Sequence, residues 1–173
     1  MELNIRNKWV SFAGSSVVKD VSENDVLKVK GRFFSMRKRK YVMDLNDKVL
    51  YQVRNRFWNF FKYCSYVFDA EGKVVASVRT KFFSLHDHLN VISDKGELTI
   101  IGNILGFDYH ITLNGKEIGH VARRISLRDS YTLTLNDDIE DIYFYVALVI
   151  ALDNIADLKR SGNESSIINS VNN

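Results

Sequence analysis

The chain has 173 residues, 46% of them hydrophobic, and a formal net charge of +3 at pH 7. This length and hydrophobic share predict one globular domain over residues 1–160, in which residues 1–25 form an N-terminal strand or extension. Cys64 is the only cysteine, and the first 25 residues contain no apolar run of signal-peptide length. The composition therefore excludes a disulfide framework and predicts an intracellular, cytoplasmic protein.

The positive charge is concentrated between Lys28 and Lys81, where there are 14 Lys or Arg residues and 4 Asp or Glu residues. The densest basic run in this stretch is Arg37, Lys38, Arg39 and Lys40. A distribution of this kind can steer an anionic partner to one part of the surface. It is also typical of solvated strand faces whose cations discourage edge pairing, and both interpretations remain open at this point.

A unit made of a turn and an alternating strand recurs along the chain. It occupies residues 45–54, 68–79 and 113–123, and the first two copies are 25 residues apart when Lys48 is aligned with Lys73. The third copy contains Asn114-Gly115, a strong signal for a two-residue hairpin turn. Asp94-Lys95-Gly96 is a looser fourth version. Units at this spacing predict a meander of antiparallel strands.

The period of two in these strands predicts which side chains share a face. Tyr51, Val53 and Asn55 fall on one face of the first unit. Arg54 and Arg56 fall on the other, and this face must point outward because unpaired charge is costly to bury. The second unit places two cations at the equivalent positions. We therefore predict an exterior cluster that consists of Arg54, Arg56, Arg79 and Lys81. Residues 37–40 would form an accessory patch.

Aromatic residues are interleaved with the basic stretch, most densely at Phe57-Trp58 and Phe60-Phe61. Core filling explains most aromatic residues of a barrel. However, a strand cannot bury two adjacent residues on one face, so part of the Phe57–Phe61 cluster is expected in an exposed or bent segment. An exposed aromatic residue beside Arg56 and Lys62 would suit a membrane interface, a protein partner or single-stranded nucleic acid.

His86-Asp87-His88 is the most metal-like motif of the chain. Alternation would place the two histidines on one face, where His110 or His120 could complete a site. The segment also has the pattern of a strand running into a turn, and no cluster of Cys or Glu accompanies it, so we expect no metal. There is no nucleophile elbow and no phosphate-binding loop. We therefore expect no catalytic residues, no cofactor and no enzymatic activity.

The C-terminal part contains eleven consecutive apolar residues, Ile142 to Leu152. A segment that is apolar on every side must be surrounded by protein, and this one is shorter than the roughly 20 residues that span a bilayer. It is predicted to be a buried helix with a capping box formed by Asp137 and Glu140. Asp153 either emerges from the barrel or pairs with a cation inside it. Residues 161–173 are polar and are predicted to form a disordered tail.

The ordered set of these segments resembles the LURP-one-related family. The set comprises the D-x-x-G-K hairpins, Lys81-Phe82-Phe83-Ser84-Leu85, Asp108-Tyr109-His110-Ile111, Ile118-Gly119-His120-Val121-Ala122-Arg123, Asp129-Ser130-Tyr131 and the final apolar helix. The resemblance covers roughly residues 26 to 158. That family is grouped with tubby C-terminal domains and phospholipid scramblases. The resemblance implies a mainly β fold, a closed antiparallel barrel of about twelve strands around a hydrophobic C-terminal helix.

The resemblance also guides the functional prediction. Tubby domains bind phosphoinositides through exterior basic residues, and scramblase-like proteins act at membranes. No tubby lipid-binding motif matches this chain residue by residue, so the resemblance assigns no site. We predict a non-enzymatic protein, peripheral at the membrane, that binds anionic phospholipid or phosphoinositide head groups through the exterior cations. A protein-interaction or scaffold module is the first alternative, and nucleic-acid binding through the same face is the second.

Overall fold

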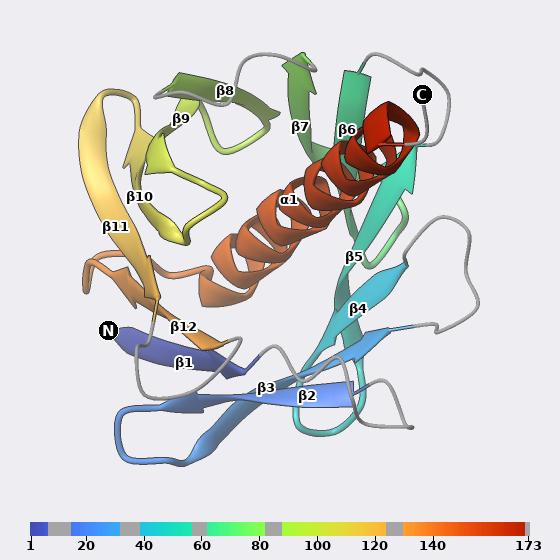
Figure 1. Cartoon of the computed structure of the whole chain (residues 1–173). Helices are drawn as coiled ribbons and strands as arrows, with labels where there is room; N and C mark the ends of the chain where they lie inside the picture. Colours follow the sequence, from blue (N-terminus) through green and yellow to red (C-terminus); the bar gives the residue numbers. More distant parts are fainter. Residues whose placement is uncertain (7–14, 32–38, 57–61, 82–87, 124–129, 172–173) are drawn as a thin grey trace.

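A computed structural model describes residues 1–6, 15–31, 39–56, 62–81, 88–123 and 130–171. These residues form twelve strands and one helix (Figure 1). The elements are β1 (Glu2–Arg6), β2 (Ser15–Asp20), β3 (Asp25–Gly31), β4 (Lys40–Met43), β5 (Val49–Arg56), β6 (Lys62–Asp69), β7 (Val74–Lys81), β8 (His88–Ser93), β9 (Leu98–Asn103), β10 (Asp108–Leu113), β11 (Lys116–Arg123), β12 (Ser130–Leu135) and α1 (Ile142–Val171).

The strands form a closed antiparallel barrel. Each strand pairs with its neighbours in the chain, and β1 pairs with β12 to close the ring. The predicted closed barrel around a C-terminal helix is thus confirmed. In a meander of this kind all even-numbered strands end at the same rim of the barrel, which is also where β12 leads into α1. The hairpin turns β2–β3, β4–β5, β6–β7, β8–β9 and β10–β11 therefore lie at the end where the helix starts.

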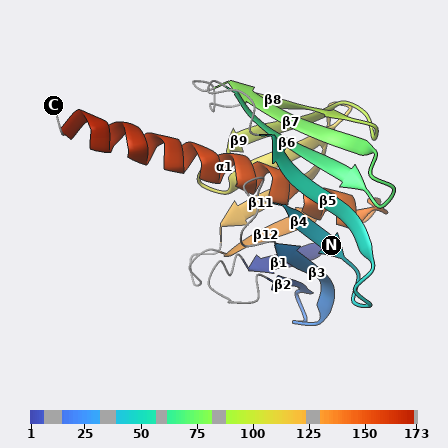
Figure 2. The same cartoon turned by 90° about the vertical axis from the view of Figure 1, so that its right-hand side faces the viewer.

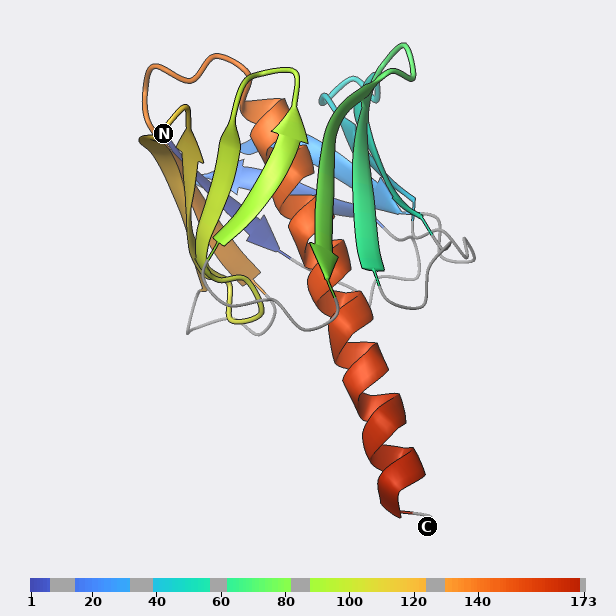
Figure 3. The same ribbon diagram turned by 90° about the horizontal axis from the view of Figure 1, so that it is seen from above.

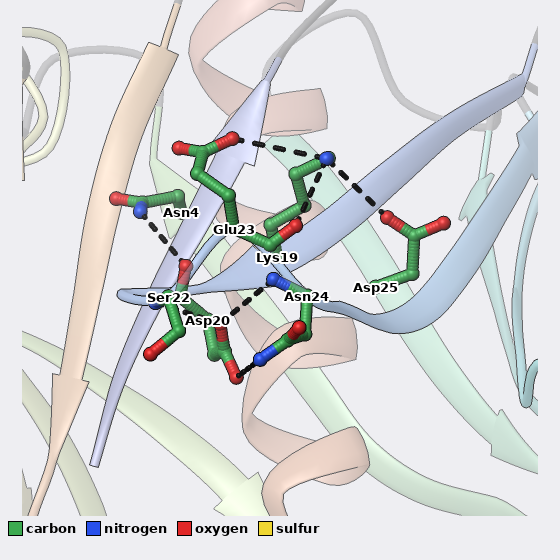
Figure 4. Close-up of polar contacts among 7 residues, drawn as sticks. All are labelled: Asn4, Lys19, Asp20, Ser22, Glu23, Asn24 and Asp25. Atoms are coloured by element: carbon green, nitrogen blue, oxygen red, sulfur yellow. Dashed lines mark hydrogen bonds and ion pairs between the residues drawn. The ribbon is translucent and has the colours of Figure 1, made fainter.

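A repeated valine marks these hairpins. Val18, Val42, Val67 and Val91 are buried, and each lies two residues before a polar residue that opens the turn. The polar residues recur at intervals of 24, 25 and 24 positions: Asp20, Asp44, Asp69 and Ser93. The Asp20 carboxylate accepts hydrogen bonds from the backbone N–H groups of Ser22 (2.8 Å) and Asn24 (2.9 Å), as Figure 4 shows. Aspartate at this position stabilises the turn because its side chain replaces a backbone acceptor.

Helix α1 runs through the barrel and continues beyond its other rim (Figures 2 and 3). It has 30 residues and so is about 45 Å long. Every residue from 144 to 156 is buried, which confirms the helix sheathed by strands that the apolar run predicts. Among the described elements it packs mainly against β5 and β6. No helix in the described part of the chain is both long and apolar enough to cross a membrane.

The structure differs from the sequence-based prediction at both ends of α1. Asp141 caps the helix, because its Oδ1 accepts a hydrogen bond from Phe144 N at 3.0 Å. The capping box at Asp137 and Glu140 is therefore wrong, and Asp137 instead pairs with the N-terminal ammonium at 2.9 Å. The polar segment 161–173, predicted to be disordered, is helical as far as Val171. A nucleated helix extends at little cost, and this chain has no proline to stop it.

Candidate functional site

The predicted cation cluster lies on three adjacent strands, β5, β6 and β7. Arg54 of β5 is opposite Tyr66 of β6, which is opposite Ser77 of β7. In the next row, Arg56 is opposite Cys64, which is opposite Arg79. Lys62 and Lys81 form the row after that. Arg54, Arg56, Arg79 and Lys81 thus occupy positions in three consecutive rows, and β5 and β7 are separated by roughly 10 Å.

Burial identifies the outer face of these strands. Val53 and Asn55 of β5 are buried, as are their partners Val67 and Ser65 of β6. Arg54 alternates with these inward residues and is half-buried, and Arg79 of β7 is exposed. The predicted assignment of Val53 and Asn55 to the inside and Arg54 to the outside therefore agrees with the structure.

Aromatic residues of β6 support the cation at Arg54. The Arg54 Cζ atom lies 3.9 Å from the centroid of the Phe68 ring, and the Phe68 and Tyr66 rings are 6.4 Å apart. A guanidinium over an aromatic face is held by a cation–π interaction of about 0.5–1 kcal/mol at an exposed site. Arg54 therefore has a restricted orientation on the outer face. The sequence does not predict this contact, because it joins residues that are not direct partners in the register.

Several predicted site residues have side chains outside the described part of the structure. The structure does not describe the segments 32–38 and 57–61. Arg37 and Lys38 belong to the first of these segments, and the Phe57–Phe61 cluster forms the second. For Arg56 and Lys81 the backbone is placed in β5 and β7, but the side chains are outside the description. The exterior cluster is therefore defined here by its register and by Arg54 and Arg79.

The side chain of Lys40, the last residue of the basic run, enters the barrel. Its Nζ lies 3.1 Å from Asp153 Oδ2, and the two side chains are 13% and 1% exposed. The Asp153 carboxylate thus pairs with a cation inside the barrel, which is one of the two arrangements expected for it. Lys40 alternates with the buried Val42 in β4, so it points inward. An ammonium in this place does not contribute to an exterior phosphate site.

Part of the remaining basic stretch is neutralised. Lys28 and Lys30 of β3 lie 3.2 Å and 3.0 Å from Asp47 Oδ1 in the β4–β5 turn. Hydrogen bonds from Lys30 and Lys28 lower the pKa of Asp47, so this carboxylate is ionised near neutral pH. The two lysines therefore belong to a local ion-pair group, and the exterior cluster on β5 and β7 remains the better candidate for an anionic ligand.

The metal motif predicted from the sequence contains His86 and His88. His86 lies outside the described residues, and His88 is the first residue of β8. Within the described residues, no group of three or more His, Cys, Asp or Glu side chains is arranged to hold a metal ion. Cys64 is a free, half-buried thiol in the Arg56–Arg79 row.

A family model described as LURP-one-related matches residues 1–153 of the chain. The chain belongs to the LURP-one-related family. The match covers the whole barrel and α1 as far as Asp153, so it confirms the resemblance carried by the hairpins and the apolar helix. No curated protein matches the chain.

A crystal structure of a protein from Arabidopsis thaliana has the same fold. Its TM-score to this chain is 0.59 at 17% sequence identity, and the match covers 89% of this chain and 90% of the plant protein. At this identity the likeness establishes the fold alone, which is tubby-like. Membership of the LURP-one-related family favours a binding module over an enzyme.

Proposed function

We propose that this LURP-one-related protein is a non-enzymatic module that binds anionic phosphate head groups of membrane lipids through the exterior of β5–β7. The register of these three strands carries the proposal, since it gathers the positions of four cations that are far apart in the sequence: Arg54, Arg56, Arg79 and Lys81.

The physical argument is electrostatic. A cation near an anionic membrane surface contributes about 1 kcal/mol, so four together would give modest, reversible binding. Arg54 is already oriented by Phe68, at 3.9 Å, and so loses less side-chain freedom when it contacts a phosphate oxygen. Tyr66 on the same face offers an amphipathic ring of the kind enriched at membrane interfaces.

The test is co-sedimentation with phosphatidylcholine vesicles and with vesicles that also contain phosphatidylserine or a phosphoinositide. The variant replaces all four cations with glutamine, a change that removes charge without adding repulsion. A matched control replaces four cations outside the cluster, two in hairpin turns at the other rim and two on β11, so the net charge changes by the same amount: Lys48, Lys73, Lys116 and Arg123. Circular dichroism and the melting temperature establish that both proteins are folded.

The proposal predicts binding to anionic vesicles only, retained in the control variant and lost in the β5–β7 variant. Equal loss in both variants would show that net charge alone drives binding and would contradict a specific face. Wild-type protein that fails to sediment with either anionic vesicle at low salt would refute lipid binding altogether.

A further inference from the structure

The exterior of the β10–β11 hairpin, on a part of the barrel separate from β5–β7, carries two histidines in direct contact. His110 of β10 is opposite His120 of β11 in the register. Their rings are stacked, with centroids 4.5 Å apart and an interplanar angle of 28°. Both side chains are accessible, with exposed fractions of 48% for His110 and 35% for His120.

A β-bulge is the reason that the two rings meet. Near the Asn114-Gly115 turn, Leu113 pairs with Lys116 and Thr112 pairs with Glu117. Beyond a shift between Ile111 and Thr112, Ile111 pairs with Gly119. One extra residue on β11 is thus accommodated, and without it His110 would lie opposite Gly119 instead of His120. The pairing therefore depends on a specific irregularity of the hairpin.

Each histidine also has its own carboxylate. His110 Nδ1 lies 2.9 Å from Glu117 Oε1, and His120 Nε2 lies 3.2 Å from Asp108 Oδ1. An ionised carboxylate only accepts hydrogen bonds, so the ring nitrogen facing it carries the proton in each case. In neutral rings this leaves His110 Nε2 and His120 Nδ1 with free lone pairs. A second-shell carboxylate that fixes the tautomer in this way is characteristic of metal-binding histidines.

We propose that His110 and His120 together bind one divalent transition-metal ion, with Glu117 and Asp108 as their hydrogen-bond acceptors. Imidazole nitrogen suits Cu²⁺, Zn²⁺ and Ni²⁺, and Cu²⁺ is expected to bind most tightly. The rings are near parallel in the structure, so their lone pairs converge only after the stack opens. Binding therefore requires rotation of both side chains, which lie on the exterior of the barrel and are 48% and 35% exposed. Since no third ligand converges among the described residues, water completes the coordination sphere.

The test uses Cu²⁺ for the ligand set and Zn²⁺ for affinity, at pH 7.5 with the full chain. Electron paramagnetic resonance of the Cu²⁺ complex should show hyperfine coupling to two imidazole nitrogens. Zn²⁺ titration should give one site, weakened about ten-fold or more in H110N and in H120N, since each variant leaves a single imidazole. The double variant H110N/H120N retains His86 and His88, and so measures binding elsewhere on the chain.

A further variant separates a metal site from a structural stack. E117Q keeps a side-chain oxygen that can accept from His110 but removes the charge, so Zn²⁺ should bind several-fold more weakly while the two-nitrogen Cu²⁺ signal persists. Melting temperatures without metal verify that all variants fold. Equal Zn²⁺ affinity in the wild type and the double variant, or a Cu²⁺ spectrum with fewer than two nitrogens from this pair, would overturn the proposal.

Discussion

Polar groups hold α1 at both rims of the barrel, and the two arrangements differ in how well those groups are satisfied. Where the helix starts, Asp141 Oδ2 accepts a hydrogen bond from the Tyr51 hydroxyl at 2.6 Å and pairs with Lys95 Nζ at 3.0 Å. Its Oδ1 caps the backbone of Phe144. The carboxylate is 29% exposed, so it keeps some contact with water as well.

Where the helix leaves the barrel, the polar groups are buried more deeply. Asp153 and Lys40 form an ion pair that is almost fully enclosed. Around it are buried polar atoms with no hydrogen-bond partner, on Asn55, Ser65, Tyr109 and Asn154. Asn55 and Ser65 are opposite each other, one row beyond Val53, the partner of Lys40. Burial, together with the charge of Asp153, raises the pKa of Tyr109 well above its usual value.

The comparison separates two uses of polar residues. The group at the helix start stabilises the fold, because every polar atom of Asp141 has a partner. The group at the helix exit encloses an ion pair beside amide and hydroxyl atoms without a hydrogen-bond partner, and burying such atoms costs desolvation energy. We interpret the buried pair as a device that fixes the axial position of α1. An otherwise apolar helix, buried on all sides, has few other contacts that would define how far it is inserted.

The largest effect is expected from replacing one member of the Lys40–Asp153 ion pair. K40M removes the cation that lies 3.1 Å from the buried Asp153 carboxylate, and such a change costs roughly 3–5 kcal/mol of the free energy of unfolding. D153A should be nearly as damaging, because it removes the carboxylate that pairs with the enclosed Lys40 ammonium. Urea denaturation of both variants measures the effect.

The double variant K40M/D153L is the control for this prediction. If the pair fixes the axial position of α1 more than it stabilises the fold, K40M/D153L should lose much less free energy of unfolding than the sum of the losses in the two single variants. Additive losses would show that the two residues are not coupled, and would contradict the pairing at 3.1 Å.

A smaller effect is expected at the helix start. D141A removes the cap on Phe144 N and leaves the Tyr51 hydroxyl without its acceptor, which together should cost about 1–2 kcal/mol. The matched control is E140A, since Glu140 is exposed and lies one residue before the true cap. Thermal or urea unfolding should show little change in E140A. A larger loss of free energy of unfolding in E140A than in D141A would instead support the capping box that the sequence predicts.

The sequence predicts the parts of this fold that depend on local pattern. The run from Ile142 to Leu152 has only one environment that suits it, a buried helix. The repeated unit of a turn and an alternating strand, with its first two copies 25 residues apart, predicts a meander. Because two copies of the same unit share a period, the sequence predicts one cluster of four cations: Arg54, Arg56, Arg79 and Lys81. The register of β5, β6 and β7 brings these positions together as that argument requires.

The sequence could not predict contacts that depend on where a strand begins or where it bulges. Nothing in the sequence distinguishes Lys40 from the three cations before it. Only the start of β4 at Lys40, and its alternation with the buried Val42, show that Lys40 enters the barrel. The histidine pair on β10 and β11 requires a one-residue bulge, which the residue pattern does not predict. The stacking of Arg54 on Phe68 is a diagonal contact whose formation depends on side-chain torsions.

The pH dependence of stability offers a further comparison between the two ends. Burial would raise the pKa of Asp141, but hydrogen bonds from Tyr51, Lys95 and Phe144 N outweigh it, and the pKa lies below its usual 3.8. A carboxyl whose pKa is lower in the folded state stabilises the protein above its unfolded pKa. This contribution is lost as the pH falls through the folded value. Free energies of unfolding measured from pH 6 to pH 2.5 should therefore fall below about pH 4.

D141N is the control, because asparagine does not titrate over this range. Its free energy of unfolding should be lower than that of the wild type at pH 6, and the gap should narrow as the pH falls below about 4. A gap that stays constant down to pH 2.5 would mean that Asp141 contributes through its shape and hydrogen bonds alone.

The smallest effect is expected at Asn154, and Asn4 is the buried asparagine with which it is compared. Asn154 is fully buried and both its amide atoms lack a partner, whereas Asn4 of β1 donates to Asp20 O (Figure 4) and accepts from the Thr132 hydroxyl, both at 3.3 Å. N154L should change the free energy of unfolding by less than about 1 kcal/mol, and in the stabilising direction, because it removes an uncompensated desolvation cost. N4L should destabilise by about 1–3 kcal/mol, since it leaves both partners unsatisfied. If N154L proves as damaging as N4L, the amide of Asn154 has a partner in solution, and the helix exit is as well satisfied as the helix start.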